Sequence, residues 1–386
     1  MSGKHLPYGR QDINEDDIRA VMEVLRGDWL TTGPAVERFE SAVAEYAGAS
    51  YAVSFSSGTA ALHGAMHAAG VTRGDLVLAP PMTFAATANS AIYCGGSPLF
   101  ADISEDTLCL DPVLAHAACM KAPSPVRVII PVSYAGYPVD VRPFRELASR
   151  TGAVLIEDAA HALGARRGER KVGTEADMTV FSFHPVKHIT TAEGGMVLTD
   201  SERFAKSMRL FRSHGIVKSE QEFIRPYEGP WDNDMISIGC NYRLSDMASA
   251  LGLSQMKRMD AFLSRRRELA ALYREALRGA PRGLKLPPDS PGHSYHLFPV
   301  WVIPEMRKRA FVSLRENGIG VQVHYVPVHL HSYYREKFGF KPGDFPKAEM
   351  FSSGEISLPL YPGMDDRDVR FVAEKLLAVL EEPLAY

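Results

Sequence analysis

The 386-residue chain is poor in cysteine and has no long apolar run. Its cysteines, Cys94, Cys109, Cys119 and Cys240, are scattered without a CxxC pair, which argues against a disulfide framework and against a cysteine zinc site. We expect them to be reduced core residues. The opening MSGKHLPYGRQDINEDD lacks the apolar core of a signal peptide, and no later stretch approaches the roughly 18 apolar residues of a membrane span. The sequence therefore predicts a soluble cytoplasmic protein.

The chain also lacks an excess of one charge. It has 43 basic and 46 acidic residues, a net charge of -3, and its longest basic run is the SRRRE stretch at 264–268. Nucleic-acid-binding domains carry a basic face, so we expect no nucleic-acid partner. Internal repeats and low-complexity tracts are absent too, and the length allows two domains.

The sequence does contain a series of short, continuous apolar runs separated by helical stretches. These runs are 76–79 (LVLA), 98–101 (PLFA), 126–132 (VRVIIPV), 153–158 (AVLIED), 178–183 (MTVFSF) and 196–199 (MVLT). Continuous runs suit strands buried on both faces, so the pattern predicts an α/β fold with a mostly parallel sheet flanked by helices. Two amphipathic helices come first: Asn14 caps one that ends at Gly27, and the second stops at Gly48.

The C-terminal third predicts a smaller α+β domain. The expected elements are a long helical region over about 244–277, a strand at 296–303, a helix at 311–317, a strand at 321–326 and a closing helix at 366–380. We therefore expect a large cofactor-binding domain over residues 1–255 and a small domain over 256–386. The loop PYEGPWDNDM, residues 226–235, is the expected mobile surface segment.

Polar residues gather in three stretches that we expect at the carboxyl ends of strands, where ligands collect in parallel α/β sheets. In SSGTAAL, Gly58 and Thr59 open a helix whose free amides suit a phosphate, although a plain helix cap is the alternative. In EDAAHALG, Asp158 closes a strand and requires a cationic partner unless it is only an N-cap. His161 follows one turn later, as a contact to a ligand oxygen or as a structural histidine.

Lys187 stands in FSFHPVKHITTAEGG among aromatic, hydroxyl and glycine residues. A buried lysine almost always pairs or reacts, and a desolvated amine forms Schiff bases readily. Pyridoxal 5'-phosphate (PLP) needs such a lysine, a carboxylate for its ring nitrogen, a phosphate cradle and a flat side chain over its ring. Phe84, in PMTFAATAN, is the candidate for the flat side chain, with core packing as its alternative. With Lys187 moving a proton between carbons, the set indicates transamination.

Motifs along nearly the whole chain support this interpretation: DWLTTGP, SSGTAAL, EDAAHALG, FSFHPVK, EGGMVLT, FRSHG and NYRLSDMASALGLSQ. With them the chain resembles the PLP-dependent sugar aminotransferases of the DegT/DnrJ/EryC1/StrS family, which have the aspartate-aminotransferase fold (fold type I). The resemblance implies that Lys187 forms the Schiff base with the cofactor, that Asp158 contacts the ring nitrogen and that His161 lies near the phenolic oxygen. It also implies that Ser182 joins Gly58 and Thr59 at the phosphate, and that Asn241 reaches in from the neighbouring subunit of a homodimer with shared active sites.

Within the family, LPYGRQDI, ITTAEGG and VQVHYVPVH are most similar to the branch of pseudaminic acid biosynthesis. This resemblance implies that L-glutamate donates an amine to the C4 ketone of UDP-2-acetamido-2,6-dideoxy-β-L-arabino-hexos-4-ulose. By the same analogy, the residues that line the sugar-nucleotide pocket are Tyr8, Asp28, Trp29, Leu30, Thr31, Gln322, Val323, His324 and Tyr325. Packing is an equal alternative for Tyr8 and Tyr325. Arg243 and His329 are candidate carboxylate or diphosphate contacts, with a solvated role as the favoured alternative.

Other functions stay open at the level of sequence. One is a different sugar aminotransferase of the same family, acting on a 4-keto or 3-keto sugar linked to UDP, dTDP or GDP. The sugar dehydratase branch carries histidine where the Schiff-base lysine belongs, so Lys187 argues against it. A cofactor-sensing regulator carries a DNA-binding module, and no basic helix-turn-helix segment precedes the large domain. A cofactor-binding protein without catalytic activity is the last alternative.

Overall fold

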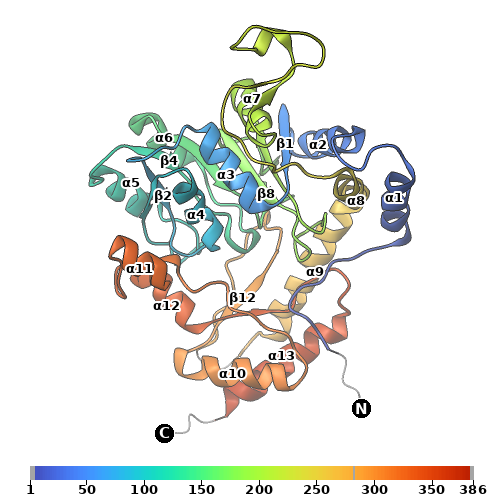
Figure 1. The fold of residues 1–386 in the computed structure, drawn as a ribbon. Coiled ribbons are helices and arrows are strands. Elements are labelled where there is room, and N and C mark those ends of the chain that lie inside the picture. The colour runs from blue at the N-terminus through green and yellow to red at the C-terminus, as the bar shows by residue number, and fades with distance from the viewer. Residues whose placement is uncertain (1–4, 281–282, 383–386) are drawn as a thin grey trace.

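The computed structural model of the protein describes residues 5–280 and 283–382. A seven-stranded sheet lies in its large, central part, with strand order β1-β9-β8-β5-β4-β2-β3 (Figure 1). Its strands are β1 (Tyr51–Phe55), β2 (Leu76–Ala79), β3 (Ser97–Phe100), β4 (Val126–Ile129), β5 (Val154–Asp158), β8 (Met178–Ser182) and β9 (Gly195–Thr199). β9 runs antiparallel to both β1 and β8, and the other neighbouring strands are parallel. The prediction of a mostly parallel α/β sheet is confirmed.

Helices cover both faces of this sheet, as its apolar strands require. One face is covered by α3 (Gly58–Ala68), α4 (Ala85–Tyr93) and α7 (Glu202–Phe211), which share one buried cluster with the sheet. The opposite face is covered by α2 (Pro34–Ala47), α5 (Pro112–Met120) and α6 (Arg142–Thr151). Along β9, Val197 joins the first cluster, while Met196 and Leu198 join the second face, so successive side chains alternate between the two layers.

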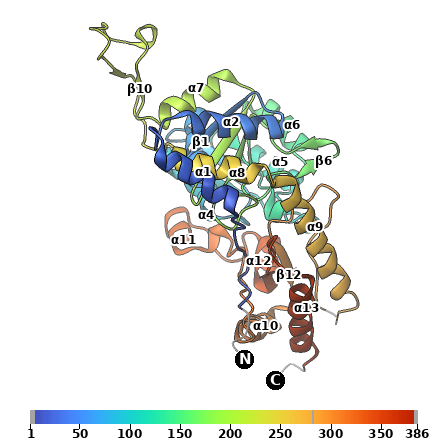
Figure 2. The ribbon, with the colours of Figure 1, turned by 90° about the vertical axis from the view of Figure 1, so that its right-hand side faces the viewer.

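The first helix, α1 (Glu15–Arg26), begins and ends where the sequence predicts. The side chain of Asn14 accepts a hydrogen bond from the amide of Asp17 at 3.0 Å, and the carboxylate of Asp17 accepts one from the amide of Asn14, which completes a capping box. α1 packs on α8 (Asp246–Met256) beside the sheet (Figure 2). Its apolar residues Ile18, Met22 and Leu25 are exposed to solvent in a single chain.

The helical region expected over 244–277 is divided into two helices, α8 and α9 (Met259–Ala276). At the break, the guanidinium of Arg258 turns back and donates to Asp17 at 2.6 Å and to the carbonyl of Asp12 at 3.0 Å. α8 stays on the large sheet, whereas α9 packs on α13 (Asp366–Glu381) in the C-terminal region. A single straight helix does not reach both partners.

The C-terminal region has its own core, below the large sheet in Figure 1. Its elements are β12 (Phe298–Trp301) paired antiparallel with β13 (Glu355–Leu358), and the helices α10 (Pro304–Glu316), α11 (Ser332–Phe338), α12 (Pro346–Gly354) and α13. Leu6 crosses from the N-terminal segment and is buried in this core. Residues 1–4, 281–282 and 383–386 of the two expected domains lie outside the described residues.

The strand expected at 321–326 does not form. Only an isolated bridge joins Gln322 to Ser357. The reason is that the amide of His324 donates to the side-chain carboxyl of Glu355 at 2.7 Å, so it is not available to a strand ladder.

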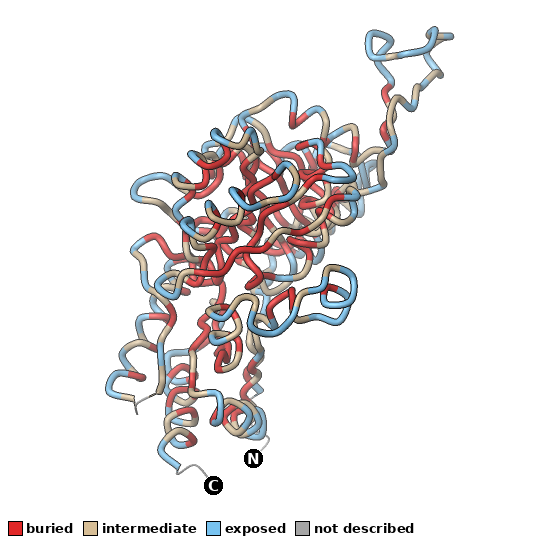
Figure 3. The backbone as a smooth tube through the Cα atoms, turned by 90° about the vertical axis from the view of Figure 1, so that its left-hand side faces the viewer, coloured by how far each residue is buried: buried red, intermediate tan, exposed pale blue. Residues whose placement is uncertain are grey.

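Short two-stranded ribbons complete the fold: β6 (Arg166–Arg167) with β7 (Arg170–Lys171), and β10 (Ile216–Val217) with β11 (Asp234–Met235). The chain from β10 to the end of β11 includes the segment 226–235 and projects away from the body, with most of its residues exposed (Figures 2 and 3). Within the described residues, no helix has the length and apolar character needed to cross a bilayer.

Candidate active site

A cavity of about 400 Å³ lies between the carboxyl ends of the central strands and the C-terminal region. Many of the residues selected from the sequence line it together: Tyr8, Gly58, Thr59, Phe84, Asp158, His161, Ser182, Lys187, His324 and Tyr325. A volume of this size is typical of small-ligand sites. The convergence follows from the sheet, because β5 and β8 are parallel neighbours and end at the same edge.

Lys187 lies in a tight turn after β8, where its amide donates to the carbonyl of His184 at 2.9 Å. Its Nζ is 3.4 Å from Nε2 of His296. Burial lowers the pKa of Lys187 to about 7, with the negative charge of Asp158 opposing that shift and the positive charge of Arg266 adding to it. Near neutral pH a large fraction of Lys187 is therefore free amine, the form that attacks a carbonyl.

Asp158, at the end of β5, is buried with its carboxylate held in place. Oδ2 accepts from the Thr87 hydroxyl at 2.6 Å, and Oδ1 accepts from the amide of Ala160 at 3.1 Å. Burial raises its pKa, while Thr87, Ala160 and the nearby charge of Lys187 lower it. The hydrogen bonds offset only part of the cost of burying this negative charge, so the carboxylate favours a cationic partner in the cavity. Asp158 is the last residue of β5, and its amide donates to the carbonyl of Pro131. The next element along the chain is the strand β6, so Asp158 caps no helix.

The start of α3 provides an anion cradle. Ser57 caps this helix, with its side chain accepting from the amide of Ala60 and its carbonyl accepting from that of Ala61. The amides of Gly58 and Thr59 precede these and lie at the positive end of the helix. Space here is tight, since a Cβ on Gly58 meets Ser182 Oγ at 3.1 Å. Small residues and free helix amides fit a phosphate.

His161 is fixed by contacts on both ring nitrogens. Nδ1 accepts from the amide of Ala135 at 3.2 Å, and Nε2 lies 3.1 Å from the hydroxyl of Tyr325. Burial and the nearby charge of Lys187 hold the pKa of His161 well below its usual range, so the ring is neutral. Because Nδ1 is an acceptor, the ring proton is on Nε2 and is donated to Tyr325. The phenolic proton of Tyr325 is thereby left for another acceptor.

Phe84 is 59% exposed and sits at the N-cap of α4, where its ring meets that of Tyr325 at a centroid distance of 5.9 Å. The alternative of core packing for Phe84 is wrong. An exposed ring on the cavity wall fits a flat ligand.

Other predicted residues do not line this cavity within one chain: Asp28, Trp29, Leu30, Thr31, Asn241, Gln322 and Val323. Asp28 and Trp29 line a hollow beside α1, α2 and α8, and Thr31 forms a bridge with Ser245. Asn241 is exposed and forms a bridge with Ser213.

The two further candidates also lie elsewhere. His329 is fully buried and its Nε2 lies 3.0 Å from Glu349, so neither ligand binding nor a solvated role describes it. Arg243 lines a separate hollow together with Ser56 and Glu193. Glu193 lines the main cavity too, so the two hollows adjoin.

The sequence did not reveal several residues of the cavity. Thr87 follows Phe84 within PMTFAATAN, so its spacing of one helical turn from Thr83 was an available signal for a polar pair. His296 precedes β12 in HSYHLFPV, and no local pattern distinguishes it from the other histidines of that stretch. Its position depends on how the C-terminal region packs against the sheet.

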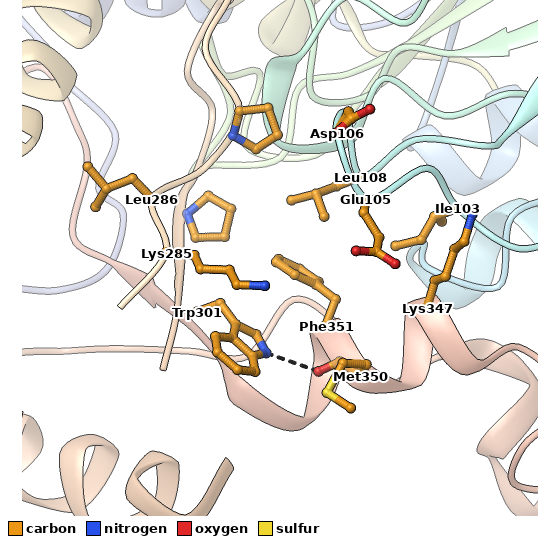
Figure 4. A pocket seen from close by; sticks show the side chains of 12 residues that line it. Ile103, Glu105, Asp106, Leu108, Lys285, Leu286, Trp301, Lys347, Met350 and Phe351 are labelled. Atoms are coloured by element: carbon orange, nitrogen blue, oxygen red, sulfur yellow. Dashed lines mark hydrogen bonds between the residues drawn. The ribbon is translucent and has the colours of Figure 1, made fainter. Parts of the chain in front are cut away.

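A second cavity, of about 220 Å³, lies between the loop 103–108 and the C-terminal region (Figure 4). Trp301 and Phe351 form its aromatic walls, and the indole of Trp301 donates to the carbonyl of Met350 at 3.0 Å. Lys285 lies over the indole ring, 4.9 Å from its centroid. This cavity contains no paired lysine and carboxylate on strand ends, so the chemistry concentrates at Lys187.

The residues present fit PLP, because the Lys187 cavity unites a reactive amine, a buried carboxylate that favours a cation, and a helix start suited to phosphate. The three features come from segments at or after the ends of three different strands, β1, β5 and β8. Their agreement is a stronger indication than any one of them.

Comparison with known proteins agrees with this geometry. The sequence profile of the DegT/DnrJ/EryC1/StrS aminotransferase family matches residues 11–377. The UDP-4-amino-4,6-dideoxy-N-acetyl-beta-L-altrosamine transaminase of Campylobacter jejuni subsp. jejuni serotype O:2 is 39% identical over 382 residues, which are 98% of each chain. Two solved structures are similar: Helicobacter pylori PseC, an aminotransferase involved in the biosynthesis of pseudoaminic acid (TM-score 0.89, 32% identity, 98% and 100% coverage), and the PLP-form of Streptococcus pneumoniae Spr1654 (TM-score 0.90, 29% identity, 98% and 99% coverage). With a match along almost its whole length, the chain belongs to the DegT/DnrJ/EryC1/StrS aminotransferase family and is a PLP-dependent sugar aminotransferase.

Proposed function

We propose that the protein transfers the amine of L-glutamate to the C4 ketone of UDP-2-acetamido-2,6-dideoxy-β-L-arabino-hexos-4-ulose. The products are UDP-4-amino-4,6-dideoxy-N-acetyl-β-L-altrosamine and 2-oxoglutarate. The proposal rests on the pairing of Lys187 with Asp158 in one cavity, together with full-length similarity to a transaminase named for this product.

PLP, when bound, supplies a ring that accepts electrons from the carbon that loses its proton. Asp158 would hold the cationic ring nitrogen, and Thr87 keeps that carboxylate oriented through its 2.6 Å hydrogen bond. Gly58 and Thr59 would bind the phosphate with their amides, with the hydroxyl of Ser182 beside Gly58. Phe84 would supply a flat apolar side chain to the ring.

In the proposed reaction, Nζ of Lys187 accepts, as general base, the proton that one carbon atom releases. It then donates this proton, as general acid, to the second carbon atom. A pKa of about 7 suits both directions, since the amine accepts and releases a proton near neutral pH. His296, 3.4 Å from Nζ, accepts a hydrogen bond from the ammonium form and limits its rotation.

Tyr8, His324 and Tyr325 face the sugar ring in this proposal, because they line the cavity opposite the strand ends. A cavity of about 400 Å³ has room for the cofactor and a sugar but is small for a whole sugar nucleotide in addition. The nucleotide then extends out of the cavity of one chain, toward residues that a second chain supplies.

A homodimer with shared active sites accounts for the predicted residues outside the cavity. The pocket of the second chain is completed by the segment 28–31 (Asp28, Trp29, Leu30 and Thr31), together with Gln322 and Val323. Asn241 reaches the cofactor of the partner chain. In support, large apolar side chains are exposed to solvent around α1 and on or just after the projecting segment from β10 to β11. They are Ile13, Ile18, Met22, Leu25, Trp29, Leu30, Ile224, Trp231, Met235 and Ile238. Exposed apolar surface of this extent is typical of an interface. The division into domains at residues 255 and 256 and a cytoplasmic location belong to the same proposal.

The test is an assay of the purified PLP enzyme with L-glutamate against a panel of 4-keto and 3-keto sugars linked to UDP, dTDP or GDP. We expect amination at C4 of the UDP-linked sugar, identified by mass and NMR, with one 2-oxoglutarate formed per amine transferred. Lys187→Ala abolishes turnover, whereas Lys206→Ala, at an exposed lysine on α7, leaves it unchanged. A preference for another nucleotide or for a 3-keto sugar contradicts the proposed substrate, and turnover by Lys187→Ala contradicts the proposed site.

A further inference from the structure

His324 ends a buried chain of hydrogen bonds that begins at Glu355. Glu355 and Ser357 are two residues apart on β13, so their side chains share one face of the strand, and both are fully buried. Ser357 Oγ lies 2.6 Å from Glu355 Oε1, and His324 Nδ1 lies 2.8 Å from Ser357 Oγ. The other carboxyl oxygen of Glu355 accepts from the His324 amide at 2.7 Å. One carboxyl group therefore holds both the backbone and the ring of His324.

The ring of His324 also lines the Lys187 cavity, beside the ring of Tyr8 at a centroid distance of 5.5 Å. Tyr134 donates its hydroxyl proton to the His324 carbonyl, which fixes the backbone further. Since Ser357 occupies Nδ1, Nε2 is the ring nitrogen left for a ligand in the cavity. Burial, together with the charge of Lys187, lowers the pKa of His324 to about 3, so the ring is neutral and carries a single proton.

The place of that proton follows from the state of Glu355, because Ser357 has one proton to donate. When Glu355 is protonated, it donates to Ser357, Ser357 donates to Nδ1, and the ring proton is on Nε2. When Glu355 is ionised, Ser357 donates to the carboxylate, Nδ1 donates to Ser357, and Nε2 carries a lone pair. The two states differ by one proton, which leaves from Nε2 into the cavity while one proton moves from Ser357 to Nδ1 and another from Glu355 to Ser357.

We propose that Glu355 and Ser357 are positioning residues that set whether His324 offers a donor or an acceptor to the sugar nucleotide, and that near neutral pH it offers the Nε2–H donor. Such a donor selects an oxygen without a proton, as in a ketone or a phosphate. The inference rests on the proposed function, since it assigns the substrate to this side of the cavity.

The electrostatic surroundings make Glu355 the member of the chain that titrates. Burial raises its pKa to about 8, against the opposing effects of Ser357, the His324 amide and the charge of Arg307 on α10. Tyr134 and Tyr325 face it as well, and burial raises the pKa of both phenols, so they are uncharged. Lys187, with a pKa of about 7, faces His324 across the cavity. Below about pH 8 the protonated, donor state of the chain therefore dominates.

The first test records the ring nitrogens of the ¹⁵N-histidine-labelled PLP enzyme by NMR from pH 6 to pH 10, with His324→Gln to assign the signal. We expect the proton of His324 on Nε2 at low pH and its transfer to Nδ1 with a midpoint near pH 8. Glu355→Gln cannot ionise, and its amide donates to Ser357, so we expect Nε2–H at every pH. Ser357→Ala separates the ring from Glu355 and abolishes the transition.

The second test is kinetic. We expect the KM for the keto sugar to rise about tenfold between pH 7 and pH 9 in the wild type, as one hydrogen bond is lost, and to stay flat in Glu355→Gln. If Glu355→Gln does not fold, the NMR titration of the wild type decides alone. An unchanged His324 tautomer from pH 6 to pH 10 overturns the inference and leaves the substrate assignment standing. A tautomer change in an enzyme that aminates no UDP-linked 4-keto sugar supports the relay and overturns the substrate.

Discussion

The two walls of the Lys187 cavity differ in charge. The sheet side, formed by Gly58, Thr59, Asp158, Ser182 and Lys187, places an amine and a carboxylate on strand ends beside a helix start. The C-terminal side, formed by His296, His324 and Tyr325, carries neutral groups only, because burial lowers the pKa of both histidines and raises that of the phenol. Charge therefore acts where the cofactor has charge, and neutral hydrogen bonds act where a sugar has hydroxyl and carbonyl groups.

The two sides are also held in place differently. Backbone ladders fix the sheet side, since Asp158 and Ser182 are the last residues of β5 and β8. On the C-terminal side a buried side chain holds the loop segments in place. Arg266 on α9 donates to the carbonyls of Tyr295, His296 and Leu360 at 3.2, 3.3 and 2.9 Å. The guanidinium of Arg266 thus links two loop segments that are far apart in the chain.

Removing the negative charge of the sheet side is the most damaging change. We expect Asp158→Asn to lower kcat/KM by about 10²–10³-fold, because the cationic ring nitrogen loses its partner. The variant also lowers the pKa of Lys187 below about 7, since the carboxylate is the group that raises it. The rate at which Lys187 of the cofactor-free protein is acylated, measured by mass spectrometry, then reaches its plateau at a lower pH than in the wild type.

Thr87→Val is the matched control for Asp158→Asn, because it removes a hydrogen bond from the same carboxylate and leaves the charge in place. Lys206, exposed and paired with Glu202, serves as the internal reference for acylation. An acylation profile of Lys187 that does not move in Asp158→Asn refutes the electrostatic link between the two residues.

The same contrast explains what the sequence could reveal. Lys187 and Asp158 were predictable because continuous apolar runs mark buried strands, and parallel strands bring their ends together. The C-terminal side depends on contacts between segments far apart in the chain, such as His324 with Glu355 and Ser357. His296 was missed for that reason, and the strand expected at 321–326 is wrong because a carboxyl group takes the amide of His324.

Within the large sheet, the errors are of a different kind. β1 was missed although it pairs along its whole length with β9, because Ser54 interrupts the apolar run YAVSF. The buried hydroxyl of Ser54 is satisfied by Glu40 at 2.8 Å, a contact from α2 that no local pattern reveals. The break between α8 and α9 likewise depends on Arg258 reaching Asp12 and Asp17, more than 200 residues earlier in the chain.

A smaller change tests the neutral wall. We expect Tyr325→Phe to lower kcat/KM by about tenfold, because the phenolic proton that His161 leaves free is lost as a donor and Nε2 of His161 loses its acceptor. The pH dependence of Lys187 acylation stays unchanged, since no charge is removed. Tyr333→Phe, at an exposed tyrosine on α11, is the control. A loss as large as that of Asp158→Asn contradicts the division between a charged and a neutral wall.

The smallest effect is expected for a change of Phe84, whose ring contacts Tyr325 of the C-terminal side of the cavity. Phe84 is the N-cap of α4 and its ring meets that of Tyr325, so Phe84→Leu keeps apolar volume and removes only the flat surface. We expect the Kd for PLP, from absorbance titration of the cofactor-free protein, to rise about fivefold, in line with the value of an aromatic contact beyond its buried area. Tyr93→Leu, exposed at the far end of the same helix, leaves the Kd unchanged. If instead the Kd for PLP stays constant and the KM for the sugar rises, Phe84 contacts the sugar rather than the cofactor.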